Sequence, residues 1–176
     1  MFWLKLVTNF IKILREGQTP AQVAGGFALG AILGLSPMFT LQGLLVWLII
    51  LVLDVNLSAA TFSLGLFALI AYIFDPIFHR LGYLLLVDID GLKGLWTALY
   101  NAPIAPLTRF NNTVVIGSFV TALILFIPIY FGMKKFVIVY RATLGVRMHK
   151  MKIYQIIDRS SLVQWYKRVR NLGGVI

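Results

Sequence analysis

The chain has 176 residues, of which 60% are hydrophobic and 12% are charged, and its mean hydropathy is +0.88. Soluble domains carry about 45–50% apolar and about 25% charged residues, so this composition predicts an integral membrane protein. Because the chain has no cysteine, disulfide frameworks, thiol catalysis, iron–sulfur clusters and cysteine-type zinc sites are excluded.

The formal net charge of +10 is concentrated at the two ends, in segments 1–16 and 134–176, and the middle is nearly neutral. Under the positive-inside rule this distribution predicts cytoplasmic termini and an even number of membrane crossings. Basic ends beside membrane spans favour contact with anionic lipid over nucleic acid. The residues expected to make this lipid contact are Lys5, Lys12, Arg15, Lys134, Lys135, Lys167, Arg168 and Arg170.

Residues 1–17 are predicted to form an amphipathic interfacial helix, because polar positions recur at three- and four-residue spacing. A cleavable signal peptide is the competing interpretation, but Lys5 and Lys12 would interrupt its apolar core. A membrane domain is expected to follow at 18–133.

Residues 21–53 contain no charged side chain, and a single helix of this length would be about 50 Å long. That exceeds a hydrocarbon core of about 30 Å, so the segment must be broken or strongly tilted. Ser36-Pro37 marks a break, which predicts a helical hairpin whose tip lies in or near the membrane. Thr40 and Gln42, with Ser36, are the polar side chains expected to help satisfy the backbone at this tip.

Gly26, Gly30 and Gly34 are spaced by four in the first half of this hairpin. Such a stripe lets a neighbouring helix approach closely. A plain packing groove is the simpler interpretation, and a lipid or partner-helix site is the functional one.

Residues 57–87 are predicted to form a second span, broken at Asp75-Pro76. Two Pro-interrupted segments point to a binding site built from discontinuous helices. Asp75 is expected to pair with His79 or Arg80, and charges at membrane depth indicate a functional site. The alternative is that Asp75 caps a half-helix while Arg80 extends to the headgroups. The resulting hypothesis is a substrate or lipid path formed by Ser36, Pro37, Thr40, Gln42, Asp75, Pro76, His79 and Arg80.

An outer-face loop is predicted at 88–111, with a short amphipathic helix that carries Trp96 and Tyr100 at the interface. Residues 113–133 form the clearest span, which Lys134-Lys135 should end at the cytoplasmic face. The remainder, 134–176, is predicted to be a basic cytosolic tail with a second amphipathic helix.

A set of motifs in the hydrophobic segments can be compared with known families: Gly30-xxx-Gly34-Leu35-Ser36-Pro37, Gln42, Asn56, Thr61, Asp75-Pro76 and Leu81-Gly82. Together they resemble the pattern of the bacterial domain-of-unknown-function 2062 family. The resemblance covers roughly residues 20–135, and Asp75 departs from the family, where Asn is usual. It implies an inner-membrane protein of Gram-negative bacteria with no settled activity, sometimes found beside or fused to enzymes of envelope glycans or lipids.

The expected fold is an all-α integral membrane protein with a Pro-broken hairpin, further transmembrane helices and interfacial helices at both ends. An intramembrane enzyme would need two carboxylates, a Ser with a nearby base or a His cluster on facing helices. The chain offers only Asp75 with His79, and Ser36 at an unknown distance, so no catalytic residue, metal site or cofactor is expected. The favoured function is a small multi-pass inner-membrane subunit that handles or channels envelope lipids. Its expected partners are membrane phospholipid and a protein partner or further copies. A homo-oligomeric lipid scramblase or transporter, and an anchor or scaffold for an envelope enzyme, are the alternatives.

Overall fold

The structure is a computed structural model that describes residues 18–150, with side chains as far as Thr143. Helices and connecting turns make up this part of the chain, which contains no strand, so the all-α prediction is confirmed. The chain divides into two compact units between Val137 and Ile138, and the packing below concerns the first unit. The predicted helix at 1–17 and the tail residues 151–176 lie outside the described residues, together with Lys5, Lys12, Arg15, Lys167, Arg168 and Arg170.

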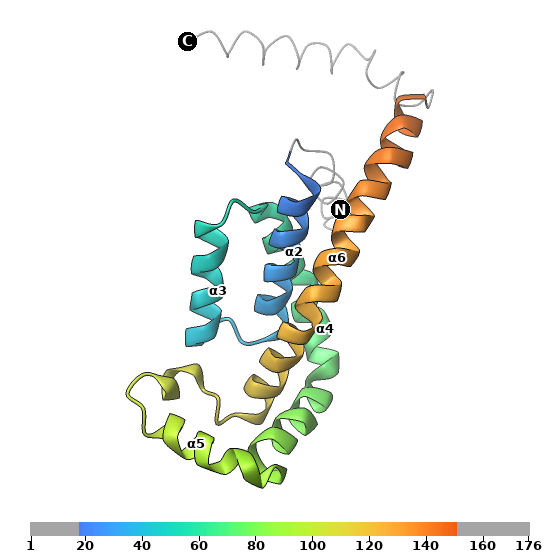
Figure 1. Ribbon diagram of the computed structural model, residues 1–176. Coiled ribbons are helices and arrows are strands. Elements are labelled where there is room, and N and C mark those ends of the chain that lie inside the picture. The colour runs from blue at the N-terminus through green and yellow to red at the C-terminus, as the bar shows by residue number, and fades with distance from the viewer. Residues whose placement is uncertain (1–17, 151–176) are drawn as a thin grey trace. The chain divides into compact units, whose positions relative to one another are not determined.

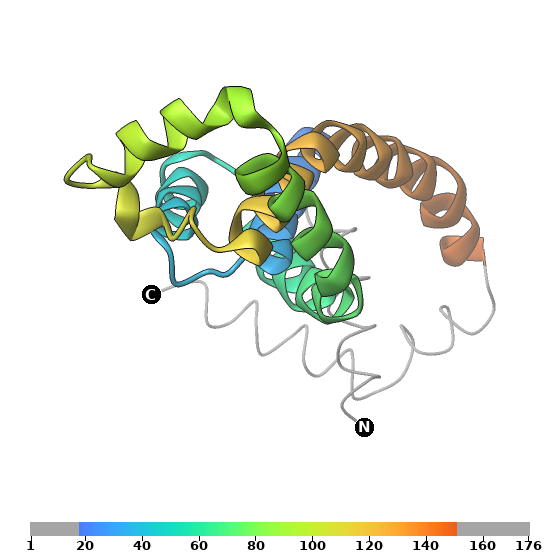
Figure 2. The same ribbon diagram turned by 90° about the horizontal axis from the view of Figure 1, so that it is seen from below.

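The main helices, in chain order, are α2 (Pro20–Leu35), α3 (Leu41–Val52), α4 (Leu57–Tyr83), α5 (Lys93–Tyr100) and α6 (Thr113–Lys150). A π-helical turn at Leu84–Asp88 and a 3₁₀ turn at Asp90–Leu92 connect α4 to α5, and a 3₁₀ turn at Ala105–Thr108 precedes α6. Figure 1 shows α2 beside α4 and α3 returning antiparallel to α2. Figure 2 shows the same ribbon from below, where α5 and the segment after it arch past α3.

The start of α2 is fixed by a capping box. The backbone N–H of Gln22 donates to Thr19 Oγ1 at 3.2 Å, and Thr19 N–H donates to Gln22 Oε1 at 2.8 Å. The same Gln22 side chain donates through Nε2 to Asp54 Oδ2 at 2.6 Å, and the backbone carbonyl of Gln22 accepts from Asn56 N–H at 3.0 Å. Asn56 in turn caps α4 by accepting from Ala59 N–H at 2.6 Å. The starts of α2 and α4 are therefore tied together at one level.

α2 ends at Leu35, where Ser36 adopts extended backbone before Pro37, and α3 begins at Leu41. Thr40 caps α3 by accepting from Gly43 N–H at 3.3 Å. Two helices thus flank the Ser36-Pro37 break, because Pro cannot continue the hydrogen-bond ladder and disfavours helix at the residue before it.

The glycine stripe of α2 packs against the backbone of α4. A Cβ added at Gly26 would meet the carbonyl oxygen of Asn56, and one added at Gly30 would meet that of Ala60. At Gly34 the added Cβ would lie 2.6 Å from the carbonyl oxygen of Leu64. Contacts in steps of four on both helices mean that α2 and α4 run parallel. A polar bond supports this packing, since the buried Ser63 Oγ donates to Phe27 O at 2.6 Å.

The predicted break at Pro76 is wrong: α4 continues through Pro76 to Tyr83. Proline costs this helix the one hydrogen bond that the Tyr72 carbonyl would accept, and no extended residue follows it. Ser36-Pro37 differs because Ser36 leaves the helical region and its neighbours form a turn. The second segment therefore contains no half-helix that starts at Pro76.

α6 packs against the end of α4 through two further glycines. A Cβ at Gly82 would meet the carbonyl oxygen of Thr113, and one at Gly117 would meet that of Phe78. The helix also contains Pro128 and continues past Lys134-Lys135 to Lys150, so the lysines do not end it. By length and composition, the helical segments Leu57–Asp88 and Thr113–Thr143 could each cross a membrane.

Candidate functional site

Two of the three polar side chains predicted for the hairpin tip are satisfied by nearby backbone. The buried Ser36 Oγ donates to Ile32 O at 2.7 Å, and the buried Thr40 Oγ1 donates to Pro37 O at 2.8 Å. Both therefore stabilise the turn that Pro37 creates, as expected of polar groups beside a broken helix.

Gln42, in the first turn of α3, is the exception. Its side chain is 9% exposed, and its amide oxygen is buried without a hydrogen-bond partner among the described residues. A buried polar atom left unpaired costs about 1–3 kcal/mol, so an unpaired amide in native packing requires an explanation.

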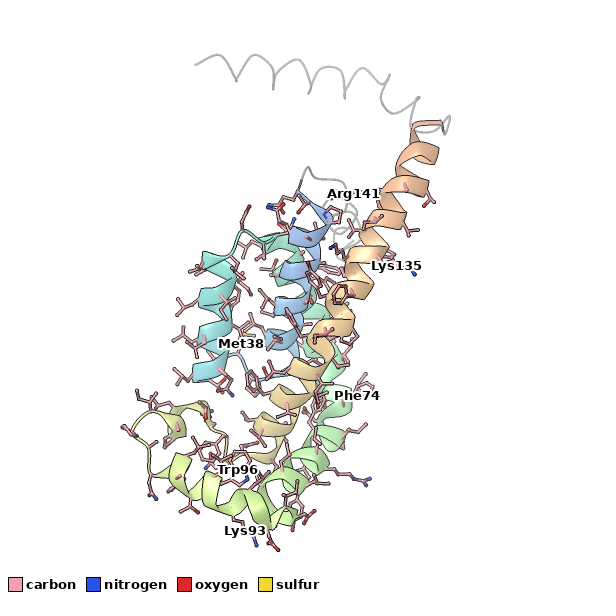
Figure 3. The ribbon with its side chains drawn as sticks, viewed as in Figure 1. Met38, Phe74, Lys93, Trp96, Lys135 and Arg141 are labelled. Carbon is pink, nitrogen blue, oxygen red and sulfur yellow. The ribbon has the colours of Figure 1, made fainter. Side chains whose placement is uncertain are left out.

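Below the hairpin tip lies a cavity of about 610 Å³, here called the tip cavity. Its walls come from the tip itself, from α3 and from the 3₁₀ turn before α6. Aromatic and aliphatic side chains dominate them, and one wall residue is charged; the wall includes Met38, Phe39, Leu44, Trp47, Leu107 and Arg109. In Figure 3, Met38 lies between α2 and α3, near the turn that joins them.

The charged wall residue, Arg109, is held in an uncommon backbone conformation. Its φ is 55°, in the left-handed region, and it ends the 3₁₀ turn Ala105–Thr108. Its N–H donates to Pro106 O, and its carbonyl accepts from Asn112 N–H, each at 3.0 Å. Non-glycine residues adopt this region at some cost, and the neighbouring bonds hold the residue there. The guanidinium is exposed and has no protein partner among the described residues.

A second cavity of about 210 Å³, the Trp96 cavity, lies between α5 and the start of α6. Trp96 is fixed by donating from its indole Nε1 to Leu85 O at 2.9 Å. Its ring stacks on that of the buried Phe110, with centroids 5.8 Å apart. Figure 3 shows Trp96 on the side of α5 that faces the bundle. Trp96, for which the sequence favoured an interfacial position over a ligand pocket, thus lies in a cavity wall.

A third cavity of about 380 Å³, the Phe126 cavity, lies between faces of α2, α3 and α6. Leu45, Val46 and Ile49 line it from α3, and Leu123 and Phe126 line it from α6. Gln42 and Phe119 belong to the walls of both the Trp96 cavity and the Phe126 cavity. Neither of these two cavities has a charged residue in its wall.

The second predicted cluster is not brought into these cavities. Asp75, His79 and Arg80 are exposed on α4, and none of them lines any of the three cavities. The expected pairing is wrong: His79 Nδ1 bonds Thr113 Oγ1 at 2.7 Å, and the ion pair found in the described residues is Lys93–Asp90. The helical spacing is present, but His79 bonds α6 instead, and no ion pair links these three side chains in the described part of the chain.

The remaining predicted residues lie either in a helix contact or on the surface of α6. Gly26, Gly30 and Gly34 pack against the backbone at the start of α4. Lys134 Nζ lies 6.0 Å from the centre of the Tyr130 ring, a cation–π arrangement, and Lys135 is exposed on α6 (Figure 3).

Arg109 and Phe119 were missed by sequence reasoning. Arg109 follows two prolines and precedes Phe110, and nothing in this spacing predicts a left-handed backbone or a cavity wall. Phe119 is part of an apolar stripe on α6 that also contains Val115 or Ile116, Leu123 and Phe126. Helical spacing could have found that stripe, although not what faces it.

The arrangement is suited to binding an amphiphile. Apolar and aromatic walls accept hydrocarbon, the Arg109 guanidinium can pair with an anionic group, and the Gln42 amide can hydrogen-bond a polar group in otherwise apolar surroundings.

Comparisons with known proteins identify relatives without an assigned activity. The family model described as "Uncharacterized protein conserved in bacteria (DUF2062)" matches residues 5–143. A Treponema pallidum (strain Nichols) protein described as "Uncharacterized protein" is 26% identical over 159 residues, which cover 90% of this chain and 98% of the relative. No solved structure matches.

Proposed function

This chain belongs to the bacterial domain-of-unknown-function 2062 family, and we propose that it is an inner-membrane subunit that binds and channels envelope phospholipid at the tip cavity. The observation that carries the proposal is the composition of this cavity: hydrocarbon-compatible walls with one unpaired guanidinium at the edge.

Membrane insertion is supported by the exposed surface of the helices. Large apolar side chains are exposed along both spanning candidates, among them Leu69, Ile73 and Phe74 on α4 and Ile124, Ile127 and Phe131 on α6. Soluble monomers rarely expose continuous apolar surface of this extent, whereas lipid-facing helices do so throughout.

The contacts between helices support the proposal that the hairpin is re-entrant. Gly34 lies against Leu64, seven residues beyond the start of α4, and at 1.5 Å per residue this is about 10 Å. With Leu57 at the cytoplasmic boundary, the tip lies well inside a hydrocarbon core of about 30 Å. We therefore treat 21–53 as a re-entrant hairpin that enters and leaves on the cytoplasmic side.

The same scale accounts for the exposed charges on α4. Twenty residues from Leu57 cover about 30 Å, which ends near Ile77. Asp75, His79 and Arg80 then lie at the outer headgroup level, where charged side chains can remain hydrated without partners. This agrees with the interpretation in which Arg80 extends to headgroups.

In this placement the tip cavity lies in the outer half of the membrane, between the hairpin and the turn Ala105–Thr108. A phospholipid could enter sideways, with its phosphate on Arg109 and its chains against Phe39, Leu44 and Trp47.

The test is native mass spectrometry of the full chain purified in mild detergent, with phosphatidylglycerol added. Arg109→Gln should reduce bound phosphatidylglycerol about fivefold, because one cation near an anionic headgroup contributes about 1 kcal/mol. Lys93→Gln is the matched control, since Lys93 is also exposed and lines no cavity, and its ammonium is already paired with Asp90 at 2.6 Å. Equal retention by all three proteins, or equal losses in both variants, would contradict the proposal.

A scramblase is a second candidate, favoured by the stripe of cavity-lining residues on α6. Phe119, Leu123 and Phe126 extend the apolar walls from the Trp96 cavity along α6 past the hairpin tip. Reconstituted full-length protein should then accelerate transbilayer movement of a labelled phospholipid. If it binds phospholipid without acceleration, the subunit function is favoured over the scramblase.

A further inference from the structure

We propose that Gln42 is a specificity-determining residue that selects a long-chain lipid alcohol, an uncharged lipid with a free hydroxyl, at the junction of the Trp96 and Phe126 cavities. This inference rests on the proposed lipid function. It names the class of ligand for the Trp96 and Phe126 cavities, which are distinct from the tip cavity where Arg109 would bind a phosphate.

Gln42 is a polar, nearly buried side chain whose amide oxygen lacks a hydrogen bond. Its side chain is 9% exposed, and its amide oxygen has no partner in the described part of the chain. Ser36 and Thr40, its polar neighbours at the tip, both bond backbone carbonyls, so the unpaired amide is not a general property of this turn.

Water is a poor partner for the Gln42 amide oxygen at this position. A buried water needs two to four polar groups around it. The walls of both cavities are nearly all apolar, and the Thr108 hydroxyl already donates to Ala105 O at 2.6 Å. A ligand hydroxyl attached to hydrocarbon would supply the missing hydrogen bond and fill the apolar space together.

The walls of the two cavities also restrict the class of ligand. No charged side chain lines either cavity, so a charged headgroup would be desolvated there without compensation. The unpaired atom of Gln42 is the amide oxygen, which can only accept, so the ligand must present a donor such as a hydroxyl. Diacylglycerol and fatty alcohols both carry this combination of a hydroxyl and long hydrocarbon.

The test compares each alcohol with its O-methyl ether, which keeps the chain and the oxygen and removes only the donor. The full chain is reconstituted in phosphatidylcholine nanodiscs, and native mass spectrometry measures binding of diacylglycerol, of hexadecanol and of the two ethers. The wild-type protein should prefer an alcohol over its ether about tenfold, which corresponds to about 1.4 kcal/mol. The pair that shows this preference identifies which lipid alcohol is bound.

Gln42→Leu should bind alcohol and ether equally, and its melting temperature without ligand should not fall, because the substitution removes an unpaired polar group. Gln42→Met, which keeps an unbranched chain, serves as the second variant if the leucine variant is not folded. Ser118→Ala is the control: Ser118 is buried but donates to Val115 O and lines none of the cavities, so the preference should persist.

Equal binding of alcohol and ether by the wild-type protein overturns the proposal, whatever the variants do, and so does a preference that survives in a folded Gln42 variant. The probes are uncharged, so this result is independent of the Arg109 test. A lost phosphatidylglycerol effect with a retained alcohol preference would refute only the headgroup site.

Discussion

At the scale of single residues, glycine positions determine how closely the helices approach. Gly30 allows contact with the Ala60 carbonyl, which a larger residue would push away, whereas Gly65 and Gly132 have open space beside their Cα atoms. Glycine in a helix otherwise costs about 1 kcal/mol relative to alanine. The glycine stripe of α2 therefore serves as a packing groove, and α4 is the helix that packs into it.

Gly30→Ala should destabilise the protein by about 1–3 kcal/mol, because the new methyl group meets backbone that cannot move aside as a flexible side chain can. Gly65→Ala, in α4, should be neutral or stabilising, since nothing lies within 4 Å of its added Cβ. Thermal unfolding of the detergent-solubilised variants measures both. Equal melting temperatures for the two variants would contradict the close α2–α4 contact.

The residue scale also separates what sequence can predict at the site from what it cannot. The polar tip residues Ser36, Thr40 and Gln42 were identifiable, because a Pro-broken apolar segment needs such groups. Which of them lacks a partner depends on the fold, since Ser36 and Thr40 find carbonyls three or four residues away. The place of Arg109 in a cavity wall was not predictable from the sequence. It depends on a left-handed backbone at Arg109 and on hairpin residues that are distant in sequence and share the same wall.

At the scale of elements, two prolines with similar sequence surroundings have different effects. Pro37 separates α2 from α3, while Pro76 lies within α4. Ser36 and Thr40 form an alternative hydrogen-bonded turn around Pro37, and α4 is instead held on both sides of Pro76 by contacts with neighbouring helices. Local sequence indicates where a break is allowed, and tertiary packing decides whether it occurs.

Pro76→Ala should keep the fold and raise the stability by up to about 3 kcal/mol, because it restores the hydrogen bond to the Tyr72 carbonyl. Thermal unfolding and the helical signal in circular dichroism measure this. If the alanine variant instead loses helical content or fails to fold, α4 is not a continuous helix that tolerates proline.

At the scale of the whole molecule, the sequence predicted the all-helical class and the hairpin segments but not how the segments after α4 cover the hairpin. Hydropathy and charge are additive along the chain, so they report segments well. Cavities arise from side chains of α3, α5 and α6 that are far apart in sequence, such as Gln42 and Trp96. No local pattern connects such residues.

The proposed topology can be tested by cysteine labelling, because the chain contains no cysteine of its own. Asp54→Cys should react with a membrane-impermeant maleimide only from the cytoplasmic side, and Gly91→Cys only from the outside. Phe39→Cys, at the hairpin tip, should react from neither side, because the proposed topology has the tip inside the hydrocarbon core. Labelling of Phe39→Cys from outside would mean that the hairpin crosses the membrane.

The central claim is that a phospholipid occupies the space between the hairpin tip and the turn before α6. The most direct measurement is photo-crosslinking of the full chain in native-composition membranes, with phosphatidylglycerol that carries a diazirine on one acyl chain. Peptides from 38–47 and 105–110 should carry most of the crosslinks, and Arg109→Gln should reduce them. Crosslinks spread evenly over the exposed faces of α4 and α6, unchanged in Arg109→Gln, would contradict the account.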